Sequence, residues 1–242
     1  MEWTDDALVL SSRPQGESSA LVVLLTAGRG RHAGLVRGGR SRSRRSTLEP
    51  GTQVQARWRA RLSDQLGALT LEPVRSYGVA LLDRPDRLAA LVSACALVEA
   101  GLSDREPHAG LYQAVLALFD ALERPAWAEA TVRWEVGLLA ELGFGLDFSR
   151  CAVTGEATGE LVAVSPRTGR AVSRAAAGPW ADRLLPLPGF LLGGVAGGVQ
   201  AVCQGLALTG YFLERHLPGG LPPARLRFAE RYGRDASKSG MA

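Results

Sequence analysis

The sequence predicts an α+β protein of two domains, a five-stranded barrel over residues 1–78 and a mainly helical domain over residues 79–242. Five short apolar or alternating runs, separated by turn residues, lie between residues 7 and 75. From residue 84 onward, apolar residues recur at helical spacing. The chain has 242 residues, of which 46% are hydrophobic and 21% are charged, and this composition suits one or two globular domains with their own cores.

The strand signal occurs five times in the first domain, over residues 7–13, 20–26, 32–37, 52–61 and 67–75. Residues 20–26 are continuously apolar, whereas residues 52–61 alternate, with Val54 and Trp58 on one face and arginines on the other. Five strands in a unit of this size suit an OB-fold, a small barrel that commonly binds single-stranded nucleic acid. An SH3-like barrel fits the pattern nearly as well.

Helices are predicted over residues 84–103, 109–123, 127–142 and about 195–216, with a short basic helix after Pro222. Residues 184–213 carry no charge and are numerous enough to cross a bilayer. Their prolines, glycines and glutamines favour a loop followed by a buried helix over a membrane anchor. The N-terminus opens with acidic residues and has no signal-peptide pattern.

One short segment carries more than all of the net positive charge. Residues 29–61 contain ten arginines and a single acid, Glu49, a net charge of +9, whereas the whole chain has +4. The planar arginine fork can donate two parallel hydrogen bonds to phosphate, so the segment predicts a polyanion interface. The predicted DNA-binding residues are Arg29, Arg31, Arg37, Arg40, Arg42, Arg44, Arg45, Arg57 and Arg59.

The alternation in residues 52–61 bears on the shape of this interface. If Trp58 lies in the core, then Arg57, Arg59 and Arg61 face solvent beside the 37–45 loop and form one continuous basic groove with it. Trp58 could instead stack on bases, as aromatic residues do in single-strand binding sites. A solvated basic loop without any ligand is a further alternative.

The sequence does not favour an enzyme. Cys95, Cys151 and Cys203 are distant from one another and odd in number, which indicates a reducing cytoplasm and not a disulfide framework. The three histidines are isolated, and the glycine- and arginine-rich stretch lacks the lysine of a phosphate-binding loop. A small hydrolase is the weakest alternative.

Three stretches follow one another along the chain: VLSSRPQGESSALVVLLTAGRGRHAGLVRGGRSRSR, RWEVGLLAELGFGLDFSRCAVTG and VSPRTGRAVSRAAAGPW. Together they resemble the bacterial RecO family of recombination mediators. The resemblance implies an N-terminal OB-fold and a helical domain with a small zinc-ribbon-like insertion, here at about residues 146–178. It also implies binding of single- and double-stranded DNA, annealing of complementary strands, and loading of RecA, with RecR, onto DNA coated by single-strand binding protein (SSB).

The chain departs from that family at the insertion. Many members bind zinc through two CxxC pairs, and the corresponding positions here are Cys151, Thr154, Ser173 and Ala176. A structural zinc site requires four ligands, yet one thiol is left and residues 146–178 contain no histidine. We therefore expect a degenerate insertion without zinc, and no cofactor.

The resemblance further implies a partner peptide, the C-terminal tail of SSB, which ends in acids and an aromatic residue. Such a peptide needs an apolar groove with a cation at its rim. The candidates are Arg133, Trp134, Leu138, Arg225 and Arg227. The alternative is that Trp134 is a core residue and Arg133 pairs with Glu129, one helical turn earlier. A function of another class also stays open, a basic adaptor that docks acidic protein tails without a primary role on DNA.

Overall fold

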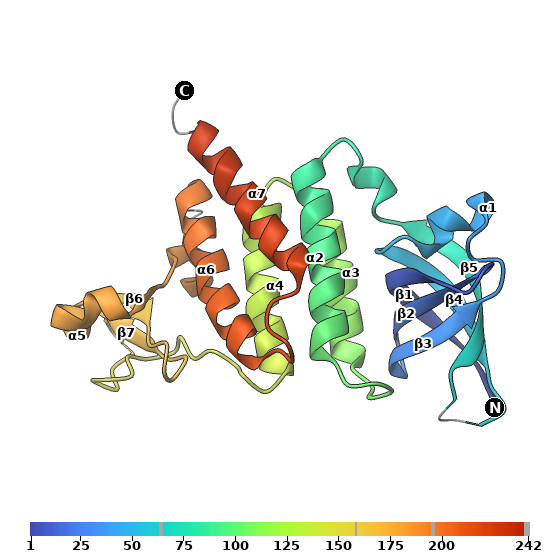
Figure 1. Cartoon of the computed structure of the whole chain (residues 1–242). Coiled ribbons are helices and arrows are strands. Elements are labelled where there is room, and N and C mark those ends of the chain that lie inside the picture. Colours follow the sequence, from blue (N-terminus) through green and yellow to red (C-terminus); the bar gives the residue numbers. More distant parts are fainter. Residues whose placement is uncertain (63–64, 158, 195–196, 240–242) are drawn as a thin grey trace. The chain divides into compact units, whose positions relative to one another are not determined.

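The computed structural model describes the chain apart from residues 63–64, 158, 195–196 and 240–242 (Figure 1). Contacts between residues divide it into two compact units, Met1–Pro125 and Ala126–Ala242. The first unit holds the barrel together with helices α2 (Pro85–Gly101) and α3 (Ala109–Ala121). The predicted boundary at residue 78 separates the barrel from the helices, whereas the division into compact units falls 47 residues later along the chain, after Pro125.

All five predicted strands are present, and they form a closed barrel in the order β1-β2-β3-β5-β4. Their bounds are β1 Glu2–Gln15, β2 Ser19–Thr26, β3 Gly30–Val36, β4 Thr52–Arg59 and β5 Gly67–Ser76. Neighbouring strands are antiparallel except for β3 and β5, whose contact is parallel. This five-stranded barrel followed by a helical region confirms the predicted fold class.

The barrel core explains two features of the strands. Val22, Val54 and Trp58 are among the buried residues that fill it, and Trp58 is 2% exposed, which confirms the prediction that it is a core residue. The parallel contact that closes the barrel pairs Gly34 with Gly67. A Cβ atom on Gly67 would lie 2.3 Å from Nε1 of Trp58, so only glycine lets β5 pass this close to the indole.

Strand β1 begins five residues before the predicted start. Residues 2–6 pair with β4 along their whole length, with Glu2 opposite Arg59 and Trp3 opposite Trp58. Three of these five residues are acidic, so the stretch lacks the alternation of apolar and polar residues by which a strand is recognised in a sequence. Glu2 forms an ion pair with Arg57 of β4, so cross-strand charge pairing supports the strand in place of apolar burial.

The arginine-rich connection between β3 and β4 was predicted as a loop, and part of it is helical. It contains one helical turn, α1 (Arg42–Arg45), followed by the short 3-10 helix η1 (Ser46–Leu48). Leu48 is 3% exposed and belongs to the barrel core. The connection is therefore anchored at its C-terminal end, and its arginines project from an ordered turn.

Helix α2 packs on β1 and β2 and gives the first unit its second layer. Cys95 lies on the buried face of this helix, where its thiol is hydrogen-bonded to the carbonyl of Val9 across 3.8 Å. Burial raises the pKa of Cys95 to about 12, so the thiol stays protonated and acts as a small core residue. A short 3-10 helix, η2 (Val79–Leu81), connects β5 to α2.

The second unit is built on helices α4 (Trp127–Glu141), α6 (Gly198–His216) and α7 (Pro223–Ser239). The first two residues of the predicted helix 195–216 lie outside the described residues. The predicted insertion at about residues 146–178 contains β6 Leu161–Val164, β7 Ala171–Ser173 and α5 Arg174–Ala177. Strand β8 (Leu185–Pro186) follows the predicted end and completes a three-stranded sheet in the order β7-β6-β8. The short helices η3 (Gly178–Arg183) and η4 (Gly189–Leu192) follow α5 and β8. No helix among the described residues is both long and apolar enough to span a bilayer.

Candidate nucleic-acid interface

The predicted DNA-binding arginines gather at opposite ends of the barrel. One group follows the C-terminal end of β3 and is called here the arginine loop: Arg37, Arg40, Arg42, Arg44 and Arg45. The other group lies where β3 begins and β4 ends, beside Trp3 and Trp58, and is called the tryptophan end: Arg29, Arg31, Arg57 and Arg59. The six steps of β3 between Gly30 and Val36 span roughly 20 Å. Figure 1 shows α1 at one end of the barrel and the N-terminus at the other.

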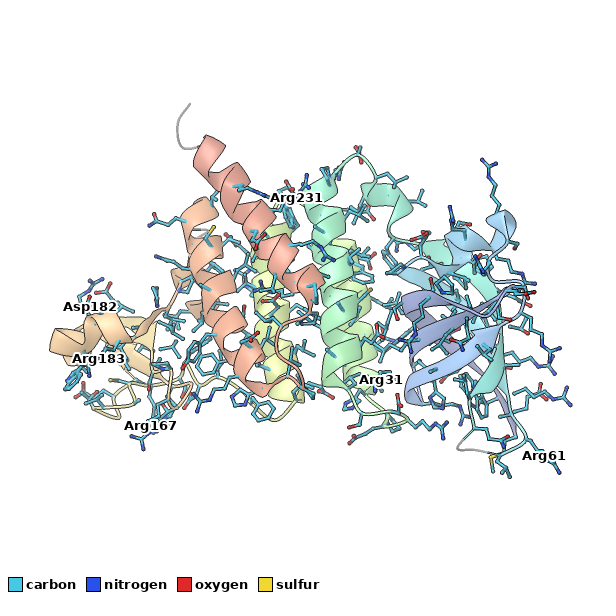
Figure 2. All side chains as sticks on the ribbon, in the orientation of Figure 1. Arg31, Arg61, Arg167, Asp182, Arg183 and Arg231 are labelled. Carbon is cyan, nitrogen blue, oxygen red and sulfur yellow. The ribbon has the colours of Figure 1, made fainter. Side chains whose placement is uncertain are left out.

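This division corrects the expectation of one continuous groove. The alternation of β4 identified which side chains face solvent, and all of its arginines are indeed exposed. It could not tell that Arg57 and Arg59 stand at the far end of the strand from the 37–45 connection. Arg61 continues the tryptophan end, and Figure 2 shows it projecting outward from the tip of the barrel.

All five side chains of the arginine loop are exposed. Arg40 donates hydrogen bonds to the carbonyls of Gly16 and Glu17, at 3.2 and 2.9 Å, which holds its guanidinium against the β1–β2 turn. Within the described part of the chain, the other four guanidinium groups of the arginine loop form no ion pair. They are therefore available to an external anion.

A polar hollow of about 340 Å³ lies at the foot of the arginine loop. Arg40 and Arg45 line it together with Arg13, Ser12 and Glu49. Arg13 was not among the predicted binding residues, because it precedes the basic segment in sequence. The β1–β2 hairpin brings it there, and only the strand register could have revealed this. The hollow and the four unpaired guanidinium groups together suit several consecutive phosphates.

Two arginines of the tryptophan end are already partnered. Arg31 pairs with Asp104 at 2.8 Å and donates a hydrogen bond to the carbonyl of Glu99 at the end of α2. Figure 2 shows Arg31 beside the loop that leaves this helix. Arg57 forms the ion pair with Glu2, and its hydrogen bond lowers the pKa of that carboxyl group. Arg29 and Arg59 are exposed and form no ion pair within the described residues.

The predicted peptide-binding residues are separated by burial. Trp134 is 8% exposed, and Leu138 and Arg225 are each 1% exposed, so these three lie inside the second unit. Arg225 of α7 forms a two-pronged ion pair with Glu135 of α4, which is fully buried. Trp134 is thus a core residue, and the guanidinium of Arg225 is committed to an internal partner.

Arg133 and Arg227 are the candidates that reach the surface. The side chain of Arg133 is 46% exposed and pairs with Glu129 at 3.5 Å, as the alternative interpretation predicted. Its guanidinium also donates a hydrogen bond to the carbonyl of Phe190 at 3.2 Å and lies 5.0 Å from the centre of that ring. Arg227 is exposed on α7 next to Leu226.

The insertion brings the four positions of the resembled zinc set together, but their chemistry does not fit the metal. The sulfur of Cys151 accepts hydrogen bonds from the backbone N–H and the hydroxyl of Ser173, each at 3.4 Å. The Ser173 hydroxyl in turn accepts a hydrogen bond from the N–H of Ala176. Ala176 offers no ligand atom in its side chain, so the positions supply one thiol and two hydroxyls.

Hydrogen bonds thus connect the four positions to one another. Burial raises the pKa of Cys151, but the hydrogen bonds from Ser173 and Thr154 outweigh it and lower the pKa to about 6. Among the described residues, no cluster of three or more histidine, cysteine or acidic side chains is arranged to hold a metal ion.

Two family models match the chain. Recombination protein O N terminal covers residues 1–77, and Recombination protein O C terminal covers residues 82–224. A DNA repair protein RecO of Rhodospirillum centenum is 60% identical over 246 residues, covering 100% of this chain and 98% of the relative. Those of Rhodospirillum rubrum and Phenylobacterium zucineum are 54% and 52% identical, covering 97% and 96% of this chain and 97% of each relative. The barrel, the helical region and these matches over both parts place the chain in the RecO family of DNA repair proteins.

Proposed function

We propose that this protein is a cytoplasmic, non-enzymatic recombination mediator that binds single- and double-stranded DNA, anneals complementary strands and helps RecA load onto SSB-coated DNA together with RecR. The observation that carries the proposal is the arginine loop, where Arg37, Arg42, Arg44 and Arg45 are exposed and form no ion pair within the described residues, and where three of these four stand on the helical turn α1. Phosphate contacts of this kind supply affinity and position without reading sequence.

Annealing places a specific demand on such a surface. Two strands repel each other through their phosphates, and a cationic surface lowers that repulsion by replacing the counterions of both strands. The strands must also be released once they have paired, which favours exposed, salt-sensitive contacts over a buried cleft. The exposed arginine loop meets both requirements.

A strand-annealing assay tests the proposal. Two complementary oligonucleotides, one carrying a fluorophore and the other a quencher, are mixed with the full-length protein. Wild type should accelerate pairing, and the triple variant Arg42→Ala, Arg44→Ala, Arg45→Ala should lose most of that acceleration. The matched control Arg150→Ala, Arg167→Ala, Arg215→Ala removes three exposed arginines of the second unit and should anneal as wild type does. Equal losses in both triple variants would show that net charge alone matters, and not the arginine loop.

We also propose that the second unit recruits the protein through the acidic, aromatic tail of SSB. The support for this is the guanidinium of Arg133, which is half-exposed and lies over the buried ring of Phe190, so that it presents a cation at the surface of the second unit. The exposed Arg227 is a second cation for the same chemistry. Arg225 is not part of this proposed surface, because its guanidinium is buried and paired with Glu135.

A further inference from the structure

A hollow lined by aromatic rings lies at the tryptophan end, and strand β3 separates it from the arginine loop. Its volume is about 380 Å³, which lies within the range of small-ligand pockets. Strands β1 and β4, the β2–β3 connection and the α2–α3 loop all contribute to it. The lining residues are Met1, Glu2, Trp3, Arg29, His32, Trp58 and Arg105.

The aromatic rings form a fixed stack. Trp3 and Trp58 are paired across β1 and β4, with ring centres 5.8 Å apart and planes inclined by 11°. His32 meets both indoles edge-on, at 5.1 and 6.0 Å. Trp58 is buried, whereas Trp3 is partly exposed, so Trp3 is the indole that solvent reaches. The buried ring beneath it holds Trp3 in one orientation before any ligand arrives.

Two cations stand around this stack. The guanidinium of Arg29 lies over the Trp3 ring, 5.5 Å from its centre, and Arg105 also lines the hollow. The acid in the lining, Glu2, is neutralised by its ion pair with Arg57. Burial and the charge of Arg105 lower the pKa of His32, so its ring is neutral at pH 7 and adds no charge. The hollow therefore combines an apolar aromatic floor with net positive charge.

Backbone contacts between the α2–α3 loop and strand β3 fix the position of Arg105. Its φ angle is 65°, in the left-handed region that non-glycine residues seldom adopt, and such strain persists where the surroundings enforce it. The backbone N–H of Arg105 donates a hydrogen bond to the carbonyl of Arg31 at 2.8 Å. Gly30 lets the loop approach, because a Cβ there would lie 1.8 Å from the carbonyl oxygen of Glu106. The strand and the loop thus hold Arg105 beside the aromatic stack.

We propose that this hollow binds one unpaired base of single-stranded DNA, stacked on Trp3, with the flanking phosphates at Arg29 and Arg105. The inference rests on the proposed DNA-binding function and assigns a different role to each end of the barrel. The arginine loop contacts the phosphates of either form of DNA, and the tryptophan end selects single strands. In a duplex the faces of the bases are covered by their neighbours, so Trp3 has nothing to stack on.

For a base to stack on Trp3, it must replace the guanidinium of Arg29 on the ring, and this replacement favours the base. A base stacked on an aromatic side chain improves affinity by about 5- to 150-fold. The contact of an exposed arginine with a tryptophan ring is worth only about 2- to 5-fold. Arg29 can therefore leave the ring and pair with a phosphate, with a net gain in affinity.

Oligonucleotides without bases test the proposal on the unmodified protein. Fluorescence anisotropy would give the affinity of the full chain for a 20-nucleotide thymidine strand, an abasic strand of equal length and charge, and a 20-base-pair duplex. The thymidine strand should bind at least 5-fold more tightly than the abasic strand. Equal affinity for the two strands would overturn the proposal. Absence of salt-sensitive binding to all three would instead overturn DNA binding itself.

Variants of Trp3 then identify the ring. Trp3→Leu should bind the thymidine and abasic strands equally, leave duplex affinity within twofold of wild type, and keep the same salt dependence, because stacking releases no counterions. Trp3→Phe preserves an aromatic face and should recover most of the preference for bases. If Trp3→Leu keeps the wild-type preference, or if it weakens duplex and single strand alike, Trp3 is not the stacking residue and the proposal is wrong.

Discussion

Arg225 and Glu135 form a buried ion pair that joins α7 to α4. Nε of Arg225 lies 2.5 Å from one carboxylate oxygen of Glu135 and Nη2 lies 2.9 Å from the other, while Thr209 of α6 donates a hydrogen bond to the same carboxylate. Nη2 also donates a hydrogen bond to the carbonyl of Leu206 at 2.8 Å. Three helices of the second unit thus converge on one carboxylate, and both charges have several partners.

This relationship predicts a large loss of stability for Arg225→Ala. Removing the guanidinium leaves a buried carboxylate without its counter-charge, which costs about 3–5 kcal/mol. Urea unfolding followed by circular dichroism measures it. Arg227→Ala, an exposed change two residues later on the same helix, should stay within about 0.5 kcal/mol of wild type. A similar, small effect of both variants would mean that the ion pair is not buried as described.

The closeness of β5 to Trp58 predicts that Gly67→Ala destabilises the barrel. The added methyl group would lie 2.2 Å from the indole ring, so the ring or the strand must shift, at a cost of about 1–3 kcal/mol. Gly110→Ala is the matched control, because nothing lies within 4 Å of a Cβ at that helical position. It should be neutral or stabilise by up to about 1 kcal/mol. The midpoint of thermal unfolding should therefore fall for Gly67→Ala and stay unchanged or rise for Gly110→Ala, and a neutral Gly67→Ala would contradict the close approach.

The hydrogen-bonded network around Cys151 predicts that the protein holds its fold without zinc. Elemental analysis of the purified protein should find far less than one equivalent of zinc, and a chelator should leave the melting temperature unchanged. Ser173→Ala removes the hydroxyl that bonds to the Cys151 sulfur and should lower the melting temperature by a few degrees. Tightly held, stoichiometric zinc would show that the insertion has other ligands than those compared here.

The proposed tail-binding surface predicts that Arg133→Ala weakens binding of an SSB tail peptide at least tenfold, about 1.4 kcal/mol. The reason is the loss of the cation that would meet the peptide's carboxylates. A fluorescence titration with the labelled peptide measures the effect, and Arg167→Ala, an exposed arginine of the insertion, is the control. DNA affinity should not change in either variant. If neither Arg133→Ala nor Arg227→Ala changes peptide binding, the surface lies elsewhere.

The fold could be predicted from the sequence because burial in this chain follows periodicity. The alternation of β4 correctly separated buried Trp58 from its exposed arginines, and the apolar stripes correctly located the long helices. The start of β1 was missed because two of its acids have partners in space: Arg57 pairs with Glu2, and the N–H of Gly28 donates a hydrogen bond to Asp5. Such pairs lie far apart in the sequence, so no local pattern contains them.

The candidate site was predictable in composition and not in arrangement. The charge of residues 29–61 identified the arginines, but the separation of the arginine loop from the tryptophan end follows from strand register. Trp3 was overlooked because a single tryptophan among acids gives no signal until it is placed opposite Trp58. Arg225 was proposed as a surface cation because its partner, Glu135, lies 90 residues earlier in the chain.

The dependence of single-stranded DNA affinity on salt tests the central claim most directly. Each phosphate neutralised contributes about 0.7 to the slope of log affinity against log salt, so four to six contacts give the wild type a slope of about −3 to −4. Removing Arg42, Arg44 and Arg45 together should flatten that slope by about 2 units. The control that removes Arg150, Arg167 and Arg215 carries the same net charge and should keep the wild-type slope. An unchanged slope in the arginine-loop variant would contradict the account.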